Sequence, residues 1–208
     1  MDICENKLSV HNIPKKYLVD KTFSYKLYLN LCYIAFWKYD LDTKDDKFIE
    51  YRLYGYNLKQ LSDISKLNRD TIKTKITKLP YRDKIDNTEM TDDGDLIDNY
   101  KFTRTKHLMF NSPKTNYTRI ELEVLSKLIT LEELTIRLYI LIQGYKYDEI
   151  YGASQKCILE SLGYSSKSHN NLSKLTKSAN KLKELGLINY VTLSDGSIKY
   201  IKYYKKEK

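Results

Sequence analysis

Residues 165–208 read SSKSHNNLSKLTKSANKLKELGLINYVTLSDGSIKYIKYYKKEK, and they indicate the fold of the second half of the chain. Leucine or alanine recurs every three or four residues from 172 to 185, which predicts a long helix over 166–185. Gly186 suits the left-handed position that ends many helices, and the apolar pair Leu187 and Ile188 begins a strand. The turn SDGS at 194–197 separates this strand from a second one. The sequence therefore predicts a hairpin after the helix, pairing roughly 187–193 with 198–204.

The same segment is strongly basic, with ten lysines against three acidic residues. When the chain of 208 residues is divided after Phe110, the first half has 20 basic and 17 acidic residues and the second has 16 and 10, so most of the net charge of +9 lies in the second half. An AT-rich genome would explain abundant lysine but not its concentration in one segment. The excess predicts a polyanionic partner, either nucleic acid or an anionic membrane surface.

The first half of the chain repeats this order of elements. Residues 22–38 have apolar side chains at helical spacing, and a helix-turn-helix follows over 57–79 with Asn57 as its cap. Pro80 ends the second of these helices. Strands over 84–91 and 96–102 then flank an Asp-Gly turn at 92–95, which predicts a second hairpin.

The second half is expected to begin in the same way as the first. A capping pattern at Thr118 predicts a short helix, and Thr130 followed by Glu133 predicts the start of a long helix that ends at Gly144. Ser154 is expected to cap a short helix that ends at Gly163. This short helix and the helix over 166–185 would form the second helix-turn-helix.

The two halves are consistent with an internal duplication. Asp93 and Asp195 are 102 residues apart, and the helix-end residues Leu79 and Leu185 are 106 apart. The polar segment around Pro113 is the natural linker. We therefore predict one domain over 1–110, a linker over 111–117 and a second domain over 118–208, each a separate folding unit of common domain size.

The phrase LKELGLI at 182–188 resembles the end of the recognition helix and the start of the wing in winged-helix DNA-binding domains. With the helix-turn-helix at 57–79, it indicates an α+β, mainly helical fold of two tandem winged helix-turn-helix domains. A tandem pair in one short basic chain resembles the replication initiators of theta-replicating plasmids and phage replication-organiser proteins of low-GC Gram-positive bacteria. The resemblance implies binding to origin repeats in double-stranded DNA, a homodimer contact through the first domain, and contact with host replication proteins.

Candidate DNA-contacting residues are the lysines and small polar residues on the outward faces of the second helices and on the second wing, because such side chains contact phosphates and base edges. In the first half they are Asn68, Arg69, Lys73, Thr74, Thr77 and Lys78. In the second half they are Ser168, Asn170, Ser173, Lys174, Lys177, Lys181, Lys199, Lys202 and Lys205. Lysines at such positions can also simply be a solvated face. Asp70 and the acidic hairpin at 92–98 make the first half the weaker candidate, so it is expected to serve for dimerisation or to contact DNA with its helix alone.

No catalytic pattern accompanies this arrangement. The three histidines are isolated, the seven glycines do not cluster, and neither a His-x-His pair nor a Gly-x-Ser-x-Gly sequence occurs. The acidic turn at 92–95 lacks the glutamate of a calcium loop. We therefore expect no enzyme activity, no metal and no cofactor.

The sequence also bears on the compartment. No run approaches the roughly 20 apolar residues of a membrane span, and the N-terminus lacks a secretion signal. Three cysteines argue against a disulfide framework, and Cys32 and Cys157 are expected to be buried. A cytoplasmic DNA-binding protein is the favoured interpretation. The alternatives are a transcriptional repressor of a mobile element and a winged-helix adaptor between proteins.

Overall fold

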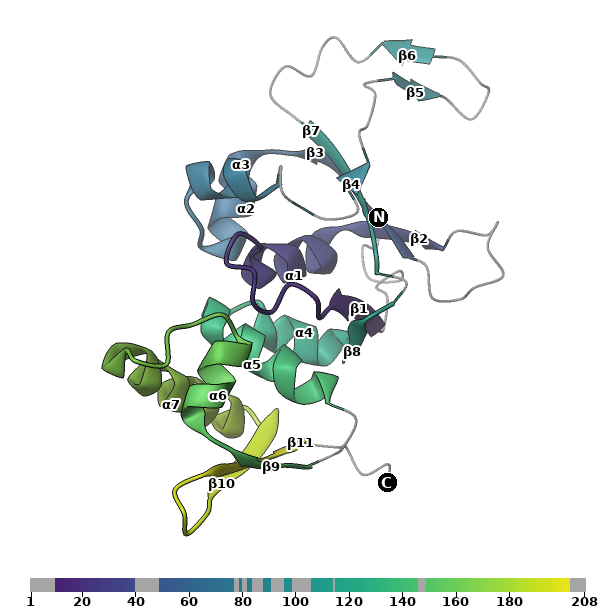
Figure 1. Ribbon diagram of the computed structural model, residues 1–208. Helices are drawn as coiled ribbons and strands as arrows, with labels where there is room; N and C mark the ends of the chain where they lie inside the picture. The colour runs from purple at the N-terminus through teal and green to yellow at the C-terminus, as the bar shows by residue number, and fades with distance from the viewer. Residues whose placement is uncertain are drawn as a thin grey trace.

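The computed structural model describes residues 10–39, 49–76, 79, 82–83, 88–90, 96–98, 106–113, 115–145 and 149–202. These residues form an α+β structure (Figure 1). The helices of the first half are α1 (Tyr25–Ile34), α2 (Leu58–Ser65) and α3 (Arg69–Ile76). Those of the second half are α4 (Leu122–Leu128), α5 (Glu133–Gly144), α6 (Gln155–Ser161) and α7 (His169–Glu184).

The strands pair antiparallel throughout the described residues. One sheet has the order β2-β3-β7-β4, formed by Phe36–Tyr39, Ile49–Tyr56, Lys106–Asn111 and Arg82–Asp83. A second has the order β10-β11-β9, formed by Ile188–Thr192, Ile198–Lys202 and Glu149–Ala153. Two further pairs are β1 (Val10–Pro14) with β8 (Tyr117–Glu121) and β5 (Thr88–Met90) with β6 (Leu96–Asp98).

Both halves have the same order of elements. In the second half the buried helix α5 leads into one strand, β9, then into two helices and then into β10 and β11. The first half follows the same order from α1, with the added strand β2 before β3 and the separate pair β5 and β6 between β4 and β7. In each sheet the last strand, β7 or β11, lies between the strand that precedes the helix pair and the strand that follows it. The halves therefore share a topology as well as the repeated order predicted from the sequence.

Several predicted boundaries are confirmed by the backbone. Asn57 caps α2 in a capping box with Gln60, and the Ser154 hydroxyl accepts a hydrogen bond from the amide of Cys157 at the start of α6. Gly163 and Gly186 have φ of 75° and 67°, as expected of residues that end helices. Both predicted hairpins contain the expected strand pairs, β5 with β6 and β10 with β11. The turn predicted at 92–95 lies outside the described residues.

The predicted helix over 22–38 is shorter in the structure. Its cap is Ser24, and the chain becomes extended at Ala35, where ψ is 147°. Residues 36–39 then form β2, in which Trp37 pairs with Tyr51 of β3. Pairing with a neighbouring strand has overridden the local helical pattern.

Three predictions near the middle of the chain are wrong. Residues after Thr118 form strand β8, because they pair with β1 from the other end of the first half, and the helix α4 begins only at Leu122. Thr130 does not cap α5, whose N-cap is Glu132. Cys157 is exposed, although Cys32 is buried as expected.

The segment predicted as a polar linker is partly packed against the rest of the protein, although Thr115 and Asn116 are exposed. Asn111 belongs to β7, and Ser112 and Pro113 are buried. The carbonyl of Asn116 accepts a hydrogen bond from the amide of Lys15 at 2.9 Å. Buried apolar residues of both halves also belong to one continuous cluster. That each half folds on its own stays a prediction.

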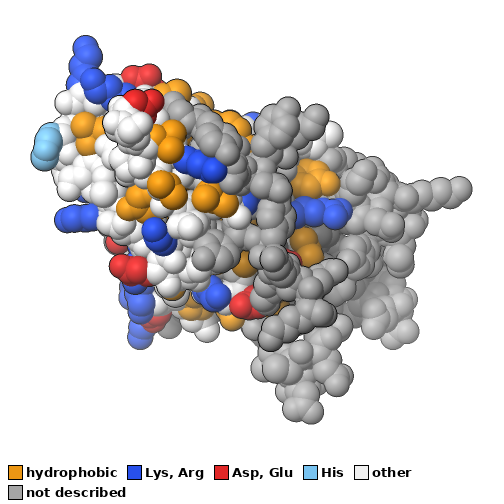
Figure 2. Space-filling model, turned by 90° about the horizontal axis from the view of Figure 1, so that it is seen from below, with side chains coloured by type: hydrophobic (Ala, Val, Ile, Leu, Met, Phe, Trp, Pro, Cys, Tyr) orange, Lys and Arg blue, Asp and Glu red, His pale blue; other side chains and the backbone are white. Residues whose placement is uncertain are grey.

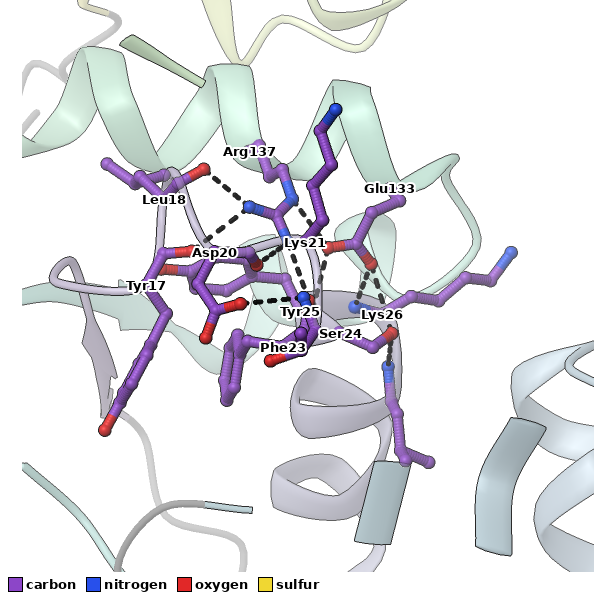
Figure 3. A network of polar contacts seen from close by, with 12 residues as sticks. Tyr17, Leu18, Asp20, Lys21, Phe23, Ser24, Tyr25, Lys26, Glu133 and Arg137 are labelled. Carbon is purple, nitrogen blue, oxygen red and sulfur yellow. Dashed lines mark hydrogen bonds and ion pairs between the residues drawn. The ribbon is translucent and has the colours of Figure 1, made fainter. Parts of the chain in front are cut away.

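A buried polar network joins the halves at the joint loop, defined here as residues 15–23 (Figure 3). The guanidinium of Arg137 on α5 is 1% exposed and pairs with Glu133 at 2.9 Å. It also donates, over 2.5–3.1 Å, to the backbone carbonyls of Tyr17, Leu18, Asp20 and Phe23. A planar group with five donors suits several carbonyls at once, which explains why arginine occupies this position.

Glu133 completes this network at the N-terminus of α1. Its carboxylate accepts hydrogen bonds from the amides of Tyr25 and Lys26, each at 3.0 Å, and from the Ser24 hydroxyl. The negative charge therefore lies where the helix dipole favours it. Glu133 was expected to take part in capping α5. It caps α1 of the first half instead.

Candidate nucleic-acid interface

The orientation of α7 is fixed by its buried face. Leu175, Ala179 and Leu182 are buried, and the Ser178 hydroxyl accepts a hydrogen bond from Thr135 of α5 at 2.9 Å. Ser168 caps the helix by accepting from the amide of Asn171. Because a helix presents its opposite side to solvent when one stripe packs inward, these contacts determine which residues are exposed.

The predicted outward residues of α7 are indeed exposed. They are Asn170, Ser173, Lys174, Lys177 and Lys181. Lys181 pairs with Glu184 at 3.3 Å, an exposed pair of small energetic weight. Seen from below, this end of the molecule shows separate lysine and arginine side chains around and between hydrophobic ones (Figure 2). We call Lys174, Lys177 and Lys181 the lysine row.

A groove of about 600 Å³ runs beside the lysine row. Its other wall is the first turn of α5 with the residues before it, 130–135, and Tyr164 also lines it. Leu131 and Leu134 are 7% exposed and give the groove an apolar floor. Burial raises the pKa of the Tyr164 phenol above its ordinary value.

The lysines predicted to contact DNA from the strands after α7 are less exposed than those on α7 itself. Lys199 is half-buried, and Lys202 is buried with its ammonium donating to the carbonyl of Tyr145. Lys202 therefore has a structural contact in place of the exposed position predicted for it. The predicted Lys205 lies outside the described residues. Lys183, which the sequence analysis did not select, is exposed and lies 5.1 Å from the centre of the Tyr190 ring.

In the first half, most candidate side chains are exposed but already have local partners. The Asn68 side chain caps α3 by accepting from the amide of Thr71 at 2.7 Å. Lys73 pairs with Asp70 at 3.4 Å, and the Thr74 hydroxyl donates to the Asp70 carbonyl. Arg69 is exposed at the first position of the helix. The predicted Thr77 and Lys78 lie outside the described residues.

Lys75 has a role that the helical pattern did not reveal. Its ammonium donates to the carbonyls of Lys21 and Thr22 in the joint loop, at 3.0 and 2.6 Å. On the other side of this loop, the carbonyl of Val19 lies against Gly163 at the turn between α6 and α7. The joint loop thus contacts both helix pairs, which lie on the same side of the molecule in Figure 1. Only a sequence signal for long-range contacts could have found these residues.

Within the described part of the chain, no group of three or more His, Cys, Asp or Glu side chains could hold a metal ion. None of its helices has the length and apolar character needed to cross a lipid bilayer.

Comparison with protein-family models, curated proteins and solved structures finds no match to this chain.

Proposed function

We propose that the protein is a sequence-specific double-stranded DNA-binding protein built from two tandem winged helices, with α7 as its main recognition helix. The observation that supports this most is the exposed lysine row on the second helix of a helix-turn-helix. Lysine ammonium groups can contact successive phosphates, while the short side chains of Asn170 and Ser173 near the helix start can reach base edges.

The order of elements supports the same proposal. A winged helix is expected to have a helix, a strand, two helices and a strand pair. The second half follows this order, with its last strand β11 between β10 and β9. The first half follows it with the added strands β2, β5 and β6. The second half is the better candidate for DNA contact because its α7 is longer than α3 and more basic. In α3 Asp70 offsets Lys73, and in α7 Glu184 offsets Lys181 but Lys174 and Lys177 make no ion pair among the described residues.

The cellular role that we propose is replication initiation on a mobile element. It rests on the resemblance described for the sequence. A homodimer and contacts with host replication proteins are part of this proposal, as are a cytoplasmic location and the absence of enzyme activity.

The salt dependence of binding to a labelled random-sequence duplex tests the DNA-binding proposal. Each phosphate contact should contribute about −0.9 to the slope of log K against log salt concentration, so three or more contacts give a slope of about −3 or steeper. No binding at low salt, or binding that salt does not weaken, would favour a protein adaptor. A footprint around the protein's own gene then separates the roles, since direct repeats indicate an initiator and one inverted repeat over a promoter indicates a repressor.

A further inference from the structure

The groove beside the lysine row has features that a DNA duplex does not use. Leu131 and Leu134 form an apolar floor, and the methylene stems of lysines on α7 extend the apolar lining. A volume of about 600 Å³ is within the range of small-molecule sites. The phosphates of a DNA duplex could contact the lysine ammonium groups, but they would leave Leu131 and Leu134 exposed to water.

The charge along the groove is predominantly positive. Lys174, Lys177 and Lys181 border one side, and within the described part of the chain Lys174 and Lys177 make no hydrogen bond or ion pair. On the opposite wall the Glu133 carboxylate is already occupied by Arg137 and the start of α1. Glu132 is the remaining acidic residue of the lining, so the cations outnumber it.

We propose that this groove binds a small amphipathic carboxylate, whose apolar tail covers Leu131 and Leu134 and whose carboxylate pairs with Lys174 and Lys177. Burial of the apolar tail contributes hydrophobic free energy to binding. The lysine ammonium groups are flexible point charges, so they suit a single anionic group such as a carboxylate. Because the same lysines belong to the proposed DNA face, the bound carboxylate competes with DNA. The groove is then a regulatory site on the recognition helix.

Decanoate is the probe for this proposal, and its binding to the full chain is measured without DNA by calorimetry and by amide chemical shifts. We expect saturable binding, with shift changes concentrated in 130–135 and 171–181, the two walls of the groove. Decanol has the same tail without the charge, and acetate has the charge without the tail. Both should bind at least about tenfold more weakly than decanoate, because decanol lacks the charge that pairs with the lysines and acetate lacks the apolar tail.

The double variant Lys174→Gln, Lys177→Gln should weaken decanoate binding about tenfold or more. The matched control is Lys183→Gln, which removes an exposed lysine of the same helix outside the groove lining and should leave binding unchanged. Amide spectra of the variants test whether they remain folded.

Three results would overturn the proposal. Equal binding of acetate would show a simple anion site, and shift changes away from the two walls would place the ligand elsewhere. Sedimentation of the protein with anionic phospholipid vesicles, without saturable decanoate binding, would assign the lysines to a membrane surface. Since these measurements contain no DNA, they are independent of the proposed function. A final titration of decanoate into a protein–duplex mixture tests the competition separately.

Discussion

At the scale of single residues, Arg137 is the side chain on which the contact between the halves depends most. Replacing it with Met leaves the joint-loop carbonyls and Glu133 without their buried partner. We expect a loss of about 3–5 kcal/mol in the free energy of unfolding, measured by urea denaturation. Lys127→Met is the matched control, because Lys127 also pairs with a glutamate one turn earlier but is only half-buried, and should cost less than about 1 kcal/mol. Equal losses would show that the buried network contributes no more than a surface pair.

Gly163 gives a second prediction at this scale. Its φ is 75°, and an added Cβ would lie 2.4 Å from the carbonyl oxygen of Val19. Gly196 has a similar φ of 78°, but nothing lies within 4 Å of its added Cβ. Gly196→Ala should therefore cost only the backbone strain of about 1–2 kcal/mol, and Gly163→Ala clearly more, in the same denaturation experiment. Equal costs would mean that the joint loop moves away freely.

At the scale of elements, the lysine row should contribute most of the DNA affinity. Replacing Lys174, Lys177 and Lys181 together by Ala should reduce the salt slope by up to roughly three units. Lys73→Ala in α3 should change the slope by clearly less than the roughly 0.9 units expected of Lys174 or Lys177, because Lys73 pairs with Asp70 and those two lysines make no ion pair among the described residues. Affinity for the random duplex, measured over a salt series, tests both. Similar losses per lysine in the two helices would mean that the halves share the DNA evenly.

The elements also show what could be predicted from the sequence. Local signals were sufficient for α2 with its Asn57 cap, for the end of α7 near Gly186 and for the hairpin after it, since caps, periodicity and turns are short-range. The start of α7 was predicted three residues too early, at 166, because Ser168 and not an earlier serine caps the helix. The strand β8 and the start of α5 were missed because their residues have distant partners: Thr118 lies opposite Ile13, and Glu133 caps α1. The exposed face of α7 followed from periodicity alone. The burial of Lys202 did not, because it depends on the carbonyl of Tyr145.

At the scale of the whole molecule, the contacts between the halves bear on whether the second half folds alone. The fragment from Asn116 to Lys208 lacks the joint loop, so Arg137 loses its carbonyl acceptors and β8 loses its partner β1. We expect this fragment to melt at a lower temperature than the whole chain when followed by circular dichroism. A fragment that begins at Asn116 but is mixed with a peptide of residues 10–24 should recover part of the difference. An unchanged melting temperature would instead support two independent folding units.

The pairing of β1 with β8 has a consequence for synthesis on the ribosome. Val10 emerges early, but its partner Glu121 is translated 111 residues later. At about 5–20 residues per second, this separation corresponds to a delay of roughly 5–20 s. During that time the nascent first half has a strand without a neighbour and a loop without Arg137. A pause in translation before residue 121 would lengthen this interval, during which a chaperone that shields exposed strand edges can bind β1.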